Sequence, residues 1–309
     1  MTKVFIDGSA GTTGLRIYER LIERRDLHLI TLPDSLRKND IARRDALFAA
    51  DIAFLCLPDE ASVKAVELAE GSKVAIIDTS TAHRTNDDWA YGFAELHGRR
   101  EQIAASKRVA NPGCHASGFI SLTEPLVREG LIAADTALTC FSVTGYSGGG
   151  KKMIAEYEAA SRPAVFDAPR QYGLTQQHKH LKEMVKICGL ETAPVFCPIV
   201  ADYYSGMCVT VPLFKKDLKG TVEAIKALYK QCYNSTIVHF DESADENGLM
   251  AGNLLSGRDD MQITVSGNDE RILLISRFDN LGKGASGAAI QNMNILLGID
   301  ETTGLVTKD

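Results

Sequence analysis

The 309-residue chain lacks the features that mark several classes of protein. No run of about 18 apolar residues occurs, so no transmembrane helix is expected. The apolar part of residues 1–8 is too short for a signal peptide. Basic residues are not in excess, because 34 Lys and Arg stand against 40 Asp and Glu, for a formal net charge of -6. We therefore expect no nucleic-acid partner and no membrane partner.

The seven cysteines also lack a pattern. None forms a C-x-x-C pair, and no zinc-type spacing appears, so neither a metal site nor a disulfide framework is predicted. Reduced thiols of this kind are typical of a cytoplasmic protein. We assign Cys114 to chemistry and the other six to packing: Cys56, Cys140, Cys188, Cys197, Cys208 and Cys232.

The segments that are present predict an α/β fold with two domains. Short apolar strands alternate with helical periods up to residue 112, which is typical of a Rossmann-like, doubly wound parallel sheet. Later strands follow one another with few helices, which predicts an α+β domain with a mostly antiparallel sheet. We expect a dinucleotide-binding domain at 1–115, completed by a C-terminal helix at 285–309. Residues 116–284 would form the catalytic and dimerisation domain.

A glycine-rich segment directly follows the first strand and precedes a helix, which is the context of a dinucleotide site. Its spacing is G-x-x-G-x-x-G, so Ala10 stands where a second glycine is more common. Strand two ends near both an acid, Asp34, and the bases Arg37 and Lys38, so the choice between NAD and NADP stays open. The loop residues expected to bind the cofactor are Gly8, Ser9, Ala10, Gly11, Thr12, Thr13 and Gly14.

A second turn, Asn111-Pro112-Gly113-Cys114, joins a short strand to a helical period. Pro112 fixes φ and Gly113 is conformationally permissive, so the pair indicates a tight turn. Cys114 would then lie at a helix N-terminus, where the dipole and free N–H groups favour a thiolate. The alternative is a small buried cysteine beside a turn.

Two further segments offer groups for an active site. The glycine-rich loop at 145–152 can present backbone N–H groups and the ammonium groups of Lys151 and Lys152 to an anion, or it can be a solvated connection. His178 and His180 are candidate proton donors, because imidazole titrates near neutral pH. Glu183 lies three residues after His180, so the two share a helix face.

A nucleotide domain followed by a reactive cysteine indicates one type of chemistry. The thiolate attacks an acyl carbon to give a thioester, and a nicotinamide exchanges hydride with the acyl group. Such a reaction also needs a proton donor and an anion site.

The motifs together resemble the N-acetyl-gamma-glutamyl-phosphate reductases, in the shorter subtype, which are related to aspartate-semialdehyde dehydrogenases. The resemblance spans nearly the whole chain, and its most discriminating part is the Pro112-Gly113 pair before the cysteine. The motifs occur in order at residues 8–14, 111–114, 145–148, 178–180 and 279–284.

The resemblance implies NADPH-dependent reduction of N-acetyl-5-glutamyl phosphate to the semialdehyde, a step of arginine biosynthesis, in a homodimer or homotetramer. It implies that Cys114 is the nucleophile and His180 the acid/base, with Glu183 supporting it and His178 as a second candidate. Lys182 stands where the family often has proline. Arg84, Asn111, Lys151 and Lys152 are expected at the substrate. Further cofactor contacts are expected from Arg37, Pro58, Ser147, Gly148 and Asn280.

Two alternatives remain at this point. One is a reductase of another acyl phosphate, similar to aspartate-semialdehyde dehydrogenase. The other is a non-catalytic nucleotide-binding sensor that uses Cys114 as a redox switch.

Overall fold

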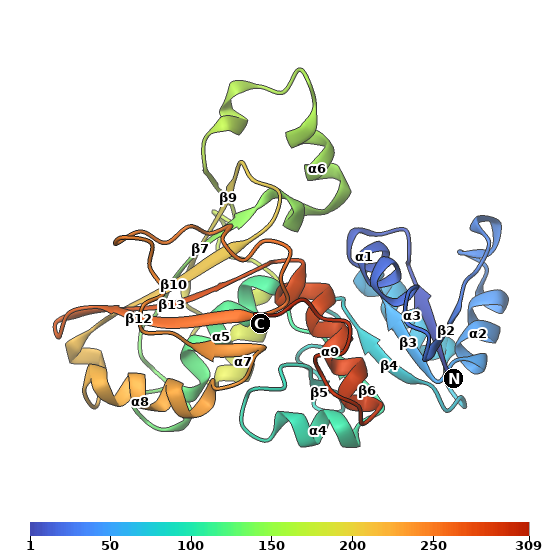
Figure 1. Cartoon of the computed structure of the whole chain (residues 1–309), viewed down its shortest axis with the longest axis horizontal. Coiled ribbons are helices and arrows are strands. Elements are labelled where there is room, and N and C mark those ends of the chain that lie inside the picture. The colour runs from blue at the N-terminus through green and yellow to red at the C-terminus, as the bar shows by residue number, and fades with distance from the viewer. Residues whose placement is uncertain (309) are drawn as a thin grey trace. The chain divides into compact units, whose positions relative to one another are not determined.

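The computed structural model describes residues 1–308, and the chain divides into two compact units (Figure 1). The first unit comprises Met1–Ala94, Gly98–Pro112 and Ala285–Leu305. The second comprises Glu95–His97, Gly113–Gly284 and the residues from Val306 onward. The chain thus enters the second unit at Gly113, directly before Cys114.

The first unit contains a six-stranded, wholly parallel sheet in the order β2-β1-β3-β4-β6-β5. This confirms the predicted doubly wound fold. The strands are β1 (Thr2–Asp7), β2 (Leu27–Ile30), β3 (Ile52–Leu55), β4 (Ala75–Asp78), β5 (Ala90–Tyr91) and β6 (Arg108–Ala110). The helices are α1 (Thr12–Leu21), α2 (Asp40–Ala49), α3 (Asp59–Leu68), α4 (Arg99–Ala105) and α9 (Gly287–Leu296).

Helices cover both faces of this sheet because successive strand residues point to opposite sides. Val4 and Ile6 pack in one apolar cluster with residues of α1 and α9. Phe5, which lies between them, packs in a second cluster with residues of α2 and α3. Burial on both faces explains why β3 is apolar at every position.

The last helix is shorter than the sequence predicted. A helix was expected over 285–309, but α9 ends at Leu296. Gly298 adopts a left-handed φ of 66°, which stops the helix. Asp300 then accepts hydrogen bonds from the Thr302 backbone N–H and hydroxyl, which replace helical bonding by a side-chain turn.

The second unit contains a seven-stranded sheet in the order β11-β12-β13-β10-β7-β9-β8. Its pairings are antiparallel except for β11 with β12 and β7 with β9, so the mostly antiparallel prediction is confirmed. The strands are β7 (Thr139–Gly145), β8 (Arg170–Gln171), β9 (Val195–Ala201), β10 (Met207–Phe214), β11 (Val238–Phe240), β12 (Met261–Gly267) and β13 (Arg271–Phe278).

Four helices accompany this sheet: α5 (Cys114–Arg128), α6 (Gly150–Glu158), α7 (His180–Cys188) and α8 (Val222–Cys232). Helix α5 packs on β10 and β13, α8 packs on β12, and α7 lies beside α5 (Figure 1). Helix α6 begins at Gly150, and Gly149 serves as its N-cap.

Helix α5 is the buried centre of the second unit. A Cβ on Gly118 would lie 2.4 Å from Val209 Cγ2, so the helix approaches β10 as closely as its backbone allows. Pro125 lacks an N–H, and the Ser121 carbonyl four residues earlier accepts the Tyr233 hydroxyl instead, at 2.6 Å. Both contacts fix the helix that carries Cys114.

Among residues 1–308, no helix combines the length and hydropathy that a membrane crossing needs. The seven cysteines are free thiols. In the same part of the chain, no group of three or more His, Cys, Asp or Glu side chains could hold a metal ion.

Candidate active site

Cys114 is the first residue of α5, and Gly113 is the N-cap. Gly113 offers no side-chain cap, so the N-terminal N–H groups depend on other partners. The Gly113 N–H donates to Glu183 Oε1 at 2.9 Å, which connects the cysteine turn to α7. A Cβ on Gly284 would lie 2.9 Å from Cys114 Cβ, so the main chain of residues 279–284 backs directly onto the cysteine.

The structure brings the predicted histidines to the same place. The rings of His178 and His180 lie 4.8 Å apart, and the His178 Nδ1 accepts the His180 backbone N–H at 3.3 Å. Both rings contact His115, the residue after Cys114, at centroid distances of 5.9 and 5.7 Å. Burial, together with the charge of Lys179, lowers the pKa of His178. The catalytic roles of both histidines stay predictions.

Glu183 lies on α7 one turn from His180 and is 2% exposed. The sequence assigned it to support His180. The contact with Gly113 gives the carboxylate a second task, because it satisfies an N–H at the N-terminus of α5.

His115 is a site residue that the sequence analysis missed. Its Nδ1 lies 2.6 Å from Ser142 Oγ, and its Nε2 lies 2.7 Å from the Tyr172 hydroxyl. Burial lowers the pKa of His115 to about 3, and the charge of His178 adds to the effect, so the ring is neutral. Its position next to Cys114 was the one available signal, because nothing in the sequence pairs it with residues 142 and 172.

A second group of predicted residues also comes together within the second unit. The Asn280 side chain donates to Ser147 Oγ at 3.0 Å and accepts the Gly206 N–H at 2.8 Å. A Cβ on Gly148 would be in ordinary contact with the same amide, at 3.5 Å. The three residues therefore form one cluster, in which Ser147 and Asn280 are buried and Gly148 is exposed. Their contact with the cofactor stays a prediction.

Lys151 and Lys152 lie on the exposed start of α6. Lys152 is 4.0 Å from Glu156, and its side chain is 90% exposed. Neither lysine makes a hydrogen bond or ion pair with the histidines within residues 1–308. Their predicted contact with substrate stays a prediction.

Arg84 and Asn111, both predicted at the substrate, have structural contacts within the first unit. Arg84 donates to the backbone carbonyls of Thr79 and Asn111, each at 2.9 Å. The Asn111 side chain donates to the Ala285 carbonyl at 3.0 Å and accepts from Asn292 at 3.1 Å. These bonds fix the chain just before Pro112, and a role at the substrate stays a prediction.

The glycine-rich loop of the first unit fits a dinucleotide pyrophosphate. Gly8 has a φ of 87°, and a Cβ there would lie 2.3 Å from the Cys56 carbonyl oxygen. A Cβ on Gly14 would lie 2.4 Å from the Gly8 carbonyl oxygen. Gly11, the N-cap of α1, provides no side-chain cap, which leaves the helix N-terminus available to an anion.

The residues that would discriminate NADP from NAD lie beyond β2. Arg37 forms an exposed ion pair with Asp34 at 2.9 Å. Such a surface pair contributes little, so Arg37 is available to a phosphate. Pro58, another predicted cofactor contact, is the N-cap of α3.

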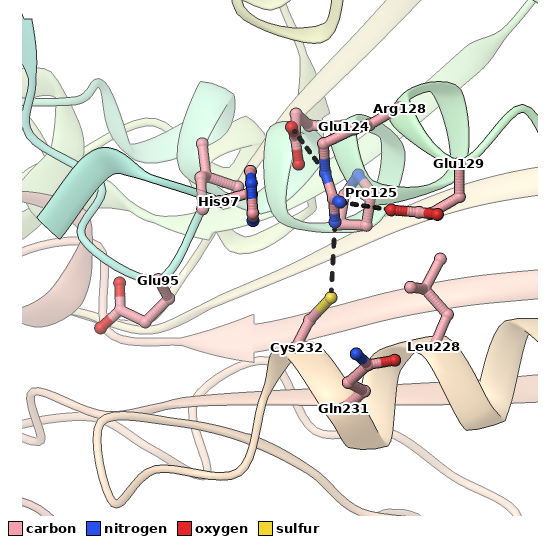
Figure 2. Close-up of a pocket in the computed structure, with 10 residues that line it drawn as sticks. Glu95, His97, Glu124, Pro125, Arg128, Glu129, Leu228, Gln231 and Cys232 are labelled. Carbon is pink, nitrogen blue, oxygen red and sulfur yellow. Dashed lines mark hydrogen bonds and ion pairs between the residues drawn. The ribbon is translucent and has the colours of Figure 1, made fainter. Parts of the chain in front are cut away.

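A separate cavity of about 240 Å³ lies at the opposite end of α5 (Figure 2). Arg128 contacts Glu124 at 3.3 Å and Cys232 Sγ at 3.7 Å there. Burial raises the pKa of Cys232 despite the nearby guanidinium, so this thiol is a poor nucleophile. Burial likewise raises the pKa of Cys56 to about 12 and of Cys208 to about 11. These values suit the packing roles predicted for them.

Comparison with known proteins places this geometry in a family. A family model described as "Semialdehyde dehydrogenase, NAD binding domain" matches residues 31–106. One described as "Semialdehyde dehydrogenase, dimerisation domain" matches residues 114–280 and so begins at Cys114.

Solved structures share the fold. Aspartate semialdehyde dehydrogenase II from Vibrio cholerae has a TM-score of 0.74 and 18% identity, covering 96% of this chain and 99% of that one. Aspartate semialdehyde dehydrogenase with NADP from Candida albicans has a TM-score of 0.65 and 15% identity, covering 96% of this chain and 98% of that one.

Curated relatives are much closer in sequence. The N-acetyl-gamma-glutamyl-phosphate reductases of Brucella ovis and Brucella canis are each 47% identical to this chain over an alignment of 307 residues, and the alignments cover 96% of this chain and 99% of theirs. This chain belongs to the N-acetyl-gamma-glutamyl-phosphate reductase family.

Proposed function

We propose that the chain catalyses the NADPH-dependent reduction of N-acetyl-5-glutamyl phosphate to N-acetylglutamate 5-semialdehyde, a step of arginine biosynthesis. The observation that carries the proposal is the position of Cys114 at the N-terminus of α5, with His178 and His180, the first residue of α7, packed against its neighbour His115. The family membership supports the choice of substrate. It also decides against the redox-sensor alternative.

In the proposed reaction the Cys114 sulfur forms a bond to the acyl carbon, and the carbon–oxygen bond to phosphate breaks. The product is a thioester, with inorganic phosphate released. NADPH, when bound, supplies the hydride that reduces the thioester carbon. A proton from His180 neutralises the resulting oxyanion to give the hemithioacetal. As the carbon–sulfur bond breaks, the hemithioacetal hydroxyl returns its proton to His180, and the products are the aldehyde and the Cys114 thiolate.

Each part of the chain has a task in this scheme. The loop from Gly8 to Gly14 would hold the pyrophosphate on the N-terminus of α1. Arg37 would contact the 2′-phosphate that distinguishes NADP from NAD. The helix N-terminus would stabilise the thiolate both before attack and as the leaving group.

We also propose that the protein self-associates as a homodimer or homotetramer through the second unit. Apolar side chains on its sheet are exposed, among them Phe141 at 43% and Phe214 and Val195 at 57% each. Exposed apolar patches of this kind are typical of interfaces between subunits. The free state of the seven thiols supports a reducing, cytoplasmic setting.

The test is an assay of the reverse reaction, in which the semialdehyde, phosphate and NADP give NADPH that is followed by absorbance. Cys114→Ser should lose nearly all turnover while it still binds NADP. Cys232→Ser is the matched control and should keep full activity, because that thiol lies at the other end of α5. Full activity in Cys114→Ser would overturn the mechanism.

The substrate and the coenzyme need their own comparison. N-acetyl-5-glutamyl phosphate should be reduced much faster than aspartyl phosphate, and NADPH should be preferred to NADH. Faster turnover of aspartyl phosphate would favour the alternative, a reductase of another acyl phosphate.

A further inference from the structure

Three polar side chains form a hydrogen-bonded series beside Cys114: Ser142 on β7, His115 on α5, and Tyr172 after β8. The two bonds, at 2.6 and 2.7 Å, use both nitrogens of His115. The ring is neutral, so it carries one N–H. The series therefore contains three polar protons for two hydrogen bonds, and one proton is left over at one of its ends.

Burial decides which end has the extra proton. Ser142 is fully buried, and its hydroxyl has no hydrogen-bond partner other than His115 within residues 1–308. If Ser142 only accepted a hydrogen bond, its own proton would be buried without an acceptor, at a cost of about 1–3 kcal/mol. Tyr172 is only partly buried, so its hydroxyl can reach a partner outside the series.

The favoured direction is thus from Ser142 to His115 and from His115 to Tyr172. The Ser142 hydroxyl donates to Nδ1, and the Nε2–H donates to the Tyr172 oxygen. This arrangement leaves the phenolic O–H of Tyr172 free to donate to another group. The bond from His115 also polarises that O–H, because linked hydrogen bonds strengthen one another.

The position of Tyr172 indicates what that group is. The Tyr172 ring lies 6.1 Å from the ring of His115, the residue after Cys114, and 6.2 Å from that of His178. Burial raises the pKa of the Tyr172 phenol, and a negative charge on Cys114 raises it further. The phenol therefore stays protonated where negative charge develops.

We propose that Tyr172 is a further catalytic residue, a hydrogen-bond donor to the oxyanion formed when a substrate acyl group is attached to Cys114, and that His115 is the positioning residue that directs its proton. The inference rests on the proposed acyl-thioester reaction. No proton is transferred in this role, because the phenol donates a hydrogen bond that strengthens as charge builds on the oxygen.

The first experiment measures kcat and KM for Tyr172→Phe, with Tyr204→Phe as the matched control. Tyr204 is 44% exposed, and its loss should leave both constants unchanged. Tyr172→Phe should lower kcat by roughly 10²- to 10³-fold with KM nearly constant, the scale for losing one oxyanion donor. A kcat equal to that of the wild type would overturn the proposal.

The second experiment tests whether His115 donates its hydrogen bond to Tyr172. In His115→Gln the side-chain amide can still donate to Tyr172, whereas in His115→Asn it is too short to do so. We expect His115→Asn to approach the loss seen in Tyr172→Phe and His115→Gln to keep more of the activity. The double variant His115→Asn/Tyr172→Phe should be no slower than Tyr172→Phe, because both changes remove one interaction.

Equal kcat values for His115→Asn and the wild type, or losses that multiply in the double variant, would overturn the positioning role. NADP binding and thermal unfolding show whether each variant is folded. If His115→Asn does not fold, Tyr172→Phe against Tyr204→Phe decides whether Tyr172 donates to the oxyanion. An inactive wild-type protein would contradict the proposed function itself, whereas an active wild type with an active Tyr172→Phe contradicts only this inference.

Discussion

Replacing Gly284 by alanine should slow the reaction far more than it destabilises the fold. The new Cβ would lie 2.9 Å from Cys114 Cβ, 3.2 Å from the Asp279 carbonyl oxygen and 3.3 Å from Phe278 Cε2. Carbon atoms in contact normally lie about 3.5–4.0 Å apart. Cys114 or the segment opposite it must therefore move by roughly 0.6 Å or more.

The cost in stability is limited by two opposing effects. Overpacking of this kind costs about 1–3 kcal/mol. Gly284 lies in a helical turn, Gly282–Ser286, and lacks a positive φ, so alanine suits its backbone and regains up to about 1 kcal/mol. We expect the free energy of unfolding to fall by about 0–3 kcal/mol.

The cost in activity is larger because the displaced atom carries the nucleophile. A misplacement of about 1 Å can cost on the order of 10²-fold in rate. We expect kcat/KM of Gly284→Ala to fall by roughly 10- to 100-fold. Iodoacetamide labelling of Cys114, followed by peptide mass spectrometry, should show a changed rate at this cysteine and unchanged rates at the other six.

Gly252→Ala is the matched control. Its Cβ would lie 2.6 Å from the Tyr203 hydroxyl and 3.8 Å from Cys208 Cβ, so it overpacks the second unit without touching Cys114. It should lose stability but keep its kcat. The reasoning is refuted if Gly284→Ala loses stability and still turns over within twofold of the wild type, because the clash would then be absorbed without moving the nucleophile.

Three further predictions concern protonation and packing. His180→Asn should lower kcat by roughly 10²- to 10⁴-fold with NADP affinity intact, and a loss of that size in His178→Asn alone would reassign the proton donor. The pKa of His115 is 6.5 in the unfolded chain and about 3 in the folded chain. The free energy of unfolding should therefore be constant above pH 6.5 and fall by about 1.4 kcal/mol for each pH unit between 6.5 and 3. Urea titrations of His115→Gln should show a shallower fall. Tyr233→Phe removes the hydrogen-bond donor of the Ser121 carbonyl. The free energy of unfolding measured in urea should fall by about 1–3 kcal/mol, with kcat unchanged.

Much of the fold could be predicted because its signals are local. Strands such as β3 are apolar at every position, and α8 begins where Thr221 caps the backbone N–H of Ala224, as its sequence period indicates. The end of α9 was missed because the stop depends on a left-handed glycine, Gly298, in an otherwise apolar stretch. Residues 95–97 belong to the second unit, but the sequence does not indicate this, because only contacts with residues far away in the sequence place them there.

The candidate site divides in the same way. Cys114 was predicted from turn residues next to it in the sequence, and His180 and Glu183 from their spacing on one helix. The bond from Gly113 to Glu183 joins residues 70 positions apart, and no periodicity signals such a pair. His115 was missed for the same reason, since its partners come from two other segments.

The packing of α5 explains why stability and catalysis can be perturbed separately in this protein. The middle of the helix is fixed by the contact of Gly118 with β10 and by the hydrogen bond from Tyr233 to the Ser121 carbonyl, and neither contact touches the nucleophile. Its first turn is fixed by Glu183, Gly284 and Ser142, which contact Gly113, Cys114 and His115 respectively. Changes at these two contacts should therefore lower the free energy of unfolding at constant kcat. Changes at the first turn should lower kcat even where the helix remains in place, because they move the sulfur or remove a donor beside it.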